Sequence, residues 1–87
     1  MNGRQLVAWN LRRLRVLRQL SQEKLAVDAG IDRAYLGSLE REQENPTVDL
    51  LDRIAAALSV SVAALFEVPD ADSPKPQTLR RGRKAAS

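Results

Sequence analysis

Apolar residues recur at helical spacing along the first 66 residues, and the pattern predicts five helices. The first covers about Gly3–Gln19, where leucines and valines form a broad apolar face and arginines occupy most of the remainder. The fourth follows a capping residue, Thr47, and places leucine, isoleucine and alanine at every third or fourth position up to Leu58. The fifth is a short segment, Val62–Phe66, for which Ser61 is a suitable N-cap.

The second and third helices are short and are joined by a tight turn. Ser21 is a natural N-cap for one of them, and Gly30 tolerates the positive φ that ends it. Asp32 caps the next, in which Leu36 and Leu39 face inward. Two helices at a steep angle with a glycine turn form a helix-turn-helix, whose second helix can enter a DNA major groove. The residues left on the outer side of that helix are Arg33, Ala34, Tyr35, Gly37 and Ser38.

We expect one domain over residues 1–68, which Pro69 ends, followed by a flexible basic tail over residues 69–87. The tail has three prolines and almost no large apolar side chain, so it cannot bury enough surface to fold alone. Its basic cluster, Arg80–Lys84, is either an arm that contacts phosphates or a solvated tail without a specific role.

The chain contains no cysteine and no histidine. These absences remove the disulfide, the soft metal ligands, the thiol nucleophile and the usual general base, so we expect neither an enzyme nor a metal, cofactor or small-molecule ligand. No apolar run is long enough to span a membrane, and no signal peptide opens the chain. We therefore expect a cytoplasmic protein without a membrane partner.

Charge is unevenly distributed along the chain. Residues 1–41 hold eight basic and four acidic residues, whereas residues 42–68 hold five acidic residues and a single arginine, Arg53. A basic half that carries a helix-turn-helix suits a phosphate backbone, and the acidic half should then point away from it. The alternative is that these charged helix faces are merely solvated.

Five motifs occur in order along the chain: Leu11–Arg15, Leu20–Ala26, Ala29–Leu36, Leu39–Arg41, and Asn45–Thr47 with the leucines that follow. On these motifs the chain resembles, from about Leu11 to Phe66, the Cro/cI-type (Xre-family) helix-turn-helix domain. The resemblance implies an all-α fold, a compact five-helix bundle of the lambda-repressor-like kind. At Gln19 and Glu42 this chain lacks the glycines that the family commonly has, so the first helix either ends outside the left-handed region or strains Gln19. Glu44 stands where a basic phosphate contact is often seen. The resemblance also implies a protein of bacterial or phage type that is associated with the nucleoid.

Three residues of the third helix are candidate readers of DNA bases. The guanidinium of Arg33 fits guanine O6 and N7, Ala34 offers a methyl group to thymine, and Ser38 adds a short hydroxyl one turn later. The alternatives are an Arg33 paired with Asp32 or Glu23, and small residues chosen only for fit.

Four further residues are candidate phosphate contacts. Gln22 lies at the helix N-terminus after Ser21, where backbone amides favour an anion, and the resemblance implies the same role. Tyr35 can donate its hydroxyl, and Arg41 and Asn45 lie in the loop after the third helix. Gln22 could instead be solvent-exposed, Tyr35 could cover a helix junction, and Arg41 and Asn45 could be plain loop residues.

The resemblance also implies a partly buried ion pair between Arg15 and Glu40, which links the first helix to the end of the third. The alternative is two separate solvated charges.

The C-terminal end has more apolar residues than a small core needs, and exposed apolar patches usually mark an interface. We expect a homodimer that places two third helices roughly 34 Å apart on a palindromic operator in double-stranded DNA. The alternatives are a fifth helix that only closes the core, and a protein that uses the same fold as an interaction module for another protein. The expected dimer-interface residues are Val60, Val62, Leu65, Phe66 and Val68.

Overall fold

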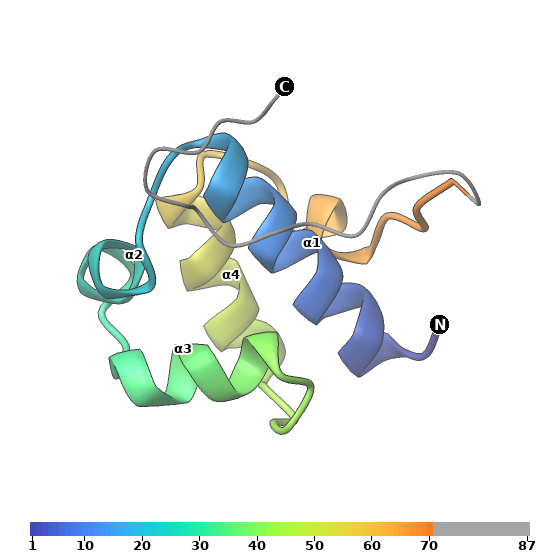
Figure 1. Cartoon of the computed structure of the whole chain (residues 1–87), viewed down its shortest axis with the longest axis horizontal. Coiled ribbons are helices and arrows are strands. Elements are labelled where there is room, and N and C mark those ends of the chain that lie inside the picture. Colours follow the sequence, from blue (N-terminus) through green and yellow to red (C-terminus); the bar gives the residue numbers. More distant parts are fainter. Residues whose placement is uncertain (71–87) are drawn as a thin grey trace, which may run out of the picture.

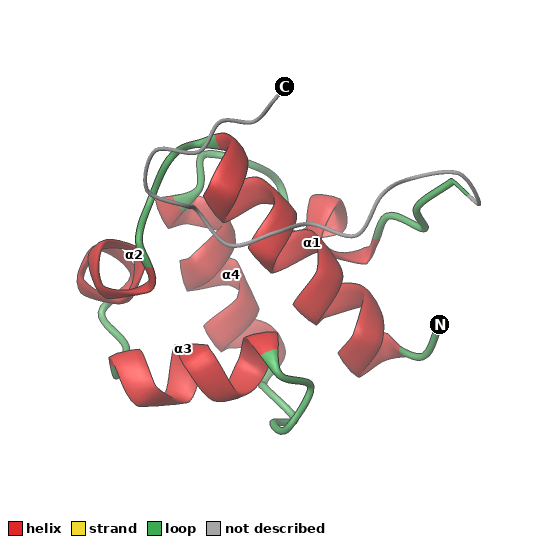
Figure 2. Ribbon diagram, in the orientation of Figure 1, coloured by secondary structure: helices red, strands yellow, loops and turns green. Residues whose placement is uncertain are grey.

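The computed structural model describes residues 1–70, and within them every regular element is helical. Four α-helices are followed by one short 3₁₀-helix, so the predicted fifth α-helix is wrong in type although its position is right. The predicted flexible basic tail lies, from residue 71 onward, outside the described residues. The elements, shown in Figures 1 and 2, are α1 (Gly3–Leu17), α2 (Gln22–Ala29), α3 (Arg33–Glu40), α4 (Val48–Ala57) and η1 (Val62–Phe66).

Each α-helix begins with a side-chain cap. The hydroxyls of Ser21 and Thr47 and the carboxylate of Asp32 each accept a hydrogen bond from a backbone N–H three residues later, which confirms the three predicted caps. At α1, Asn2 and Gln5 form a reciprocal capping box that we did not predict. The predicted Ser61 cap is wrong, because the side chain makes no capping bond; its carbonyl accepts from Ala64 N in the 3₁₀ pattern instead.

All four α-helices end in the same motif, although only one has glycine at the left-handed position. Gln19, Gly30, Glu42 and Ser59 have φ between +58° and +70°. In each case the next backbone N–H bonds to a carbonyl five residues earlier, as from Leu20 to Arg15 at 2.9 Å, which is the Schellman pattern. Helix α1 therefore ends at Leu17, two residues before the predicted end. Gln19 therefore adopts the left-handed conformation, which is strained for a residue with a side chain. The other expectation, that the first helix ends outside the left-handed region, is wrong.

The core lies between all five elements. In the ribbon of Figure 1, α3 lies along one edge of the molecule with α2 beside its beginning. Helix α4 packs on α2. Helix α3 packs on α1 and α2, and η1 packs on α1 and α4. The predicted inward residues Leu36 and Leu39 are buried. No helix within residues 1–70 combines the length and the apolar character needed to cross a membrane. The largest fully buried side chains are Leu11, Leu25, Leu36, Ile54, Leu58, Leu65 and Asn10.

Candidate nucleic-acid interface

Helix α3 presents the predicted base-reading residues on its open side. Arg33 and Ala34 are exposed in its first turn, and Ser38 is half-buried one turn later. Asp32 accepts the backbone N–H of Tyr35, and within residues 1–70 Arg33 forms no ion pair. The alternative of Arg33 paired with Asp32 or Glu23 is therefore not what the structure shows. A free guanidinium at the start of an exposed helix can reach a base edge without first breaking a contact.

A buried ion pair holds the other end of α3. Arg15 Nε donates to Glu40 Oε2 at 2.6 Å, and Arg15 Nη2 donates to Glu40 Oε1 at 2.9 Å. The side chains are only 4% and 0% exposed. Arg15 Nη1 also donates to the carbonyl of Leu20 at 2.9 Å. This bidentate geometry is the strongest that an arginine and a carboxylate can adopt, and here it ties the last residue of α3 to α1.

Gln22 belongs to the same network. Its Nε2 donates to Glu40 Oε1 at 3.1 Å, and its side-chain oxygen lies 3.5 Å from where a β-carbon on Gly37 would stand. Gln22 is therefore half-buried at the junction of α2 and α3, and it is not the ordinary solvent-exposed glutamine of the alternative. It remains at the N-terminus of α2, where a phosphate could bind the backbone amides, but its amide is already engaged.

Arg41 folds back along α3 toward Ser38. Its Nη2 donates to Ser38 Oγ at 3.2 Å, and its Nε donates to Gln43 Oε1 at 3.3 Å. Its Nη1 lies 3.3 Å from the position of a β-carbon on Gly37, so the absence of a side chain there makes room for it. The structure thus brings Arg41 next to Ser38 and Gln22, whereas Asn45 is exposed in the loop beyond.

Tyr35 is half-buried on α3. Burial raises the pKa of its hydroxyl above the ordinary value of 10.0, and the negative charge of Glu44 raises that pKa further. The hydroxyl therefore stays protonated at neutral pH and can donate a hydrogen bond. Glu44, which we did not assign to DNA, places a negative charge near this hydroxyl.

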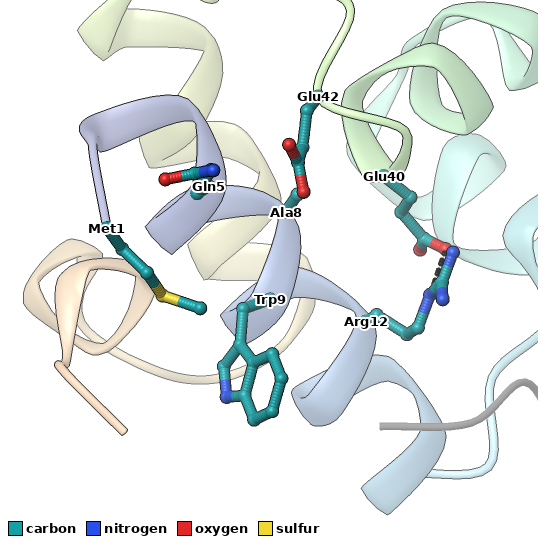
Figure 3. Close-up of a pocket in the computed structure, with 7 residues that line it drawn as sticks. All are labelled: Met1, Gln5, Ala8, Trp9, Arg12, Glu40 and Glu42. Atoms are coloured by element: carbon teal, nitrogen blue, oxygen red, sulfur yellow. Dashed lines mark ion pairs between the residues drawn. The ribbon is translucent and has the colours of Figure 1, made fainter. Parts of the chain in front are cut away.

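Arg12 is a participant that the sequence reasoning missed. Its Nε lies 3.5 Å from Glu40 Oε1 and is buried without a hydrogen-bond partner within residues 1–70. It borders a shallow pocket of about 50 Å³ shown in Figure 3, large enough for water but not for a metabolite. The signal was available, because Arg12 lies three residues before Arg15 and so shares its side of α1. The pocket is lined by Met1, Gln5, Ala8, Trp9, Arg12, Glu40 and Glu42.

The predicted dimer residues do not share one surface. Leu65 is fully buried between α1 and α4, because the tight turn of η1 directs it inward, so its assignment to an interface is wrong. Val60 and Val62 are half-buried and pack against the core. Phe66 and Val68 are exposed by 42% and 77%, and they form the outward-facing part of this end.

The chain is similar in sequence and in structure to known helix-turn-helix proteins. Residues 11–65 match the family model HTH_3, a helix-turn-helix. The control protein C.SmaI of Serratia marcescens is 42% identical over 66 residues, which cover 76% of this chain and 79% of that protein. The restriction-modification controller C.AhdI of Aeromonas hydrophila has a structure that superposes with a TM-score of 0.71 at 38% identity, over 72% of this chain and 96% of that one. The controller C.Esp1396I, solved as a tetramer with its natural 35-base-pair operator, gives a TM-score of 0.70 at 29% identity, over 76% of this chain and 87% of that one.

Proposed function

The chain belongs to the HTH_3 (Xre) family of helix-turn-helix transcriptional regulators, and we propose that it binds a palindromic operator as a homodimer through α3. The observation that carries the proposal is the exposed Arg33, which has no ion-pair partner among residues 1–70, at the start of a helix whose far end is anchored by a buried ion pair. A reading helix needs free base-contacting side chains on a fixed backbone, and α3 combines both.

The side chains divide into two groups. Arg33, Ala34 and Ser38 read base edges in the major groove. Four residues contact DNA phosphates and so position α3. Arg41 and Asn45 reach the phosphates from the loop after α3, and Tyr35 donates its hydroxyl to one. Gln22 lies at the start of α2, where the backbone amides bind a phosphate. The role of Arg15 and Glu40 is to hold α3 in place rather than to touch DNA.

Self-association is supported by the exposed apolar end and by a relative. Phe66 and Val68 are exposed at the end of the described chain, whereas Val60 and Val62 are partly buried against the core. Two such ends meeting about a two-fold axis would bury them and place the two α3 helices roughly one DNA turn apart. C.Esp1396I, a tetramer on its operator, shows that a protein with this fold can assemble on DNA. Acting on DNA in this way, the protein would work in the cytoplasm, at the nucleoid.

A footprint on the DNA upstream of its own gene tests the proposal, because it reports the site and its symmetry together. We expect a protected palindrome whose binding weakens steeply between about 50 and 200 mM salt. If no duplex from that region binds even at low salt, the DNA-binding proposal fails and an interaction module for another protein becomes the better interpretation.

The variant Arg33→Ala tests the assigned reader. We expect a loss of about 1–3 kcal/mol of binding free energy on the operator, with little change on random DNA. Arg4→Ala is the matched control, because Arg4 is exposed at the start of α1 and carries the same charge on a different helix. An equal loss on operator and random DNA would instead make Arg33 a phosphate contact.

A further inference from the structure

Arg53 reaches from α4 to the turn between α2 and α3. Its Nε donates to the carbonyl of Ala29 at 3.3 Å, and its Nη2 donates to the carbonyl of Gly30 at 2.5 Å. We propose that Arg53 is a positioning residue for DNA reading: it fixes the turn that precedes α3 and so sets the direction in which Arg33 and Ala34 point. The inference rests on the proposed function, because it assigns a residue that supports the same reading helix.

Arg53 supplies hydrogen-bond donors to carbonyls at the C-terminal end of α2. The last carbonyls of a helix lack intrahelical donors, and the helix dipole leaves negative charge there. Helix α2 has no basic residue in its last turn, so its own sequence does not neutralise this end. The guanidinium supplies both a positive charge and two donors to Ala29 and Gly30.

The position of Arg53 in the fold explains how it can affect α3. Helix α3 packs mainly on α1 and α2, whereas α4 packs on α2 and η1. Arg53 therefore connects α4 to the segment from which α3 starts, only three residues before Arg33. Arg15 holds the far end of α3 through Glu40, so the two arginines anchor the helix near both of its ends.

A direct contact between Arg53 and DNA is the competing explanation for any loss of binding. Two observations oppose it: the guanidinium is engaged with two carbonyls, and the acidic residues Asp49 and Asp52 lie on the same short helix. Fixed negative charge near a cation lowers its attraction for phosphate. The experiment nevertheless has to separate positioning from phosphate contact.

The test compares wild type with Arg53→Met, which keeps an apolar stem but removes the donors, and Arg53→Lys, which keeps the charge but has a single donor nitrogen in place of the guanidinium fork. Binding is measured by fluorescence anisotropy on the footprinted operator and on a scrambled duplex, at several salt concentrations. Circular dichroism at the binding temperature establishes that each variant is folded. Arg4→Met is the matched control for charge.

We expect Arg53→Met to weaken operator binding about ten- to a hundredfold, the scale of one charge-assisted hydrogen bond. Binding to the scrambled duplex and the salt dependence stay as in wild type, and Arg53→Lys lies in between. The inference is overturned by an equal loss on both duplexes with a shallower salt slope, which would mark a phosphate contact. It is also overturned by a lower melting temperature with unchanged operator affinity, which would mark a purely structural role. If wild type itself does not distinguish the duplexes, the proposed function fails and the inference fails with it.

Discussion

Removing either partner of the Arg15–Glu40 pair should destabilise the fold by several kcal/mol, and the two losses should differ. Both side chains are buried, so each truncation leaves an uncompensated charge in the interior, at a cost of about 3–5 kcal/mol. In Arg15→Met, the Glu40 carboxylate keeps the Gln22 amide at 3.1 Å and Arg12 at 3.5 Å. We therefore expect that loss at the lower end, about 3 kcal/mol.

The loss for Glu40→Leu should lie at the upper end, about 5 kcal/mol. Glu40 is the shared acceptor of Arg15 and Gln22 and the ion-pair partner of Arg12, so its removal strands three groups at once. Arg15 would keep only the carbonyl of Leu20. In the double variant, two apolar side chains fill the space, so we expect it to lie closer to wild type than Glu40→Leu does.

Urea unfolding followed by circular dichroism at 222 nm measures all four corners of this double-mutant cycle. If Glu40→Leu is unfolded in plain buffer, titration with a stabilising osmolyte recovers its free energy of unfolding. Losses below about 1 kcal/mol for both single variants would mean that the two charges are effectively solvated. Strictly additive losses in the double variant would show that the residues do not act as a pair.

Three further changes test individual parts of the fold. Replacing Gln19 or Glu42 by glycine should raise the free energy of unfolding by about 0.5–1 kcal/mol in urea titrations, because each residue adopts a positive φ that glycine adopts without strain; an unchanged value would show that neither position is strained. Asn10→Leu should lower the free energy of unfolding by about 2–3 kcal/mol, because the carbonyls of Leu65 and Glu67 would lose the Asn10 Nδ2 donor. A loss below about 1 kcal/mol would mean that water replaces the amide. Because the folded-state pKa of Tyr35 is raised above 10.0, its stabilising contribution is complete below pH 10 and is lost as the pH rises through that pKa. Absorbance at 295 nm should therefore titrate above pH 10, and Glu44→Gln should lower the midpoint; an unaltered midpoint would remove Glu44 as a cause.

The helix starts were predictable from sequence because N-caps are local. A short polar side chain bonds to a backbone N–H three residues later, so Ser21, Asp32 and Thr47 could be recognised without knowledge of the rest of the fold. The inward direction of Leu36 and Leu39 follows equally locally from helical spacing. The end of α1 was less accessible, because a glutamine in the left-handed region has no signature of its own.

The roles of Asn10 and Arg53 could not be read from local pattern. Besides its local bonds within α1, Asn10 donates to carbonyls 55 and 57 residues away, and the partners of Arg53 lie 24 and 23 residues away. A polar residue on a helix that is otherwise amphipathic looks solvated until the packing partner is known. The burial of Leu65 escaped for another reason. Its assignment to the interface rested on an excess of apolar residues at the C-terminal end, and an excess does not say which of these residues face the core.

The distribution of charge shows most clearly why the fold changes the interpretation. The basic excess of residues 1–41 suggested a surface for phosphates, yet three arginines of α1 are directed at carboxylates of the protein itself. Arg12 and Arg15 meet Glu40, and Arg13 lies 3.5 Å from Glu67. A guanidinium that is buried in an ion pair releases no counterion from DNA, so formal charge overstates the electrostatic attraction that this domain can offer. On α3 and at its end, Arg33 and Arg41 remain as exposed cations beside the candidate reading face. Arg12 and Arg15 thus hold the end of α3, and the proposed recognition of DNA would depend on the few charges that the core leaves free.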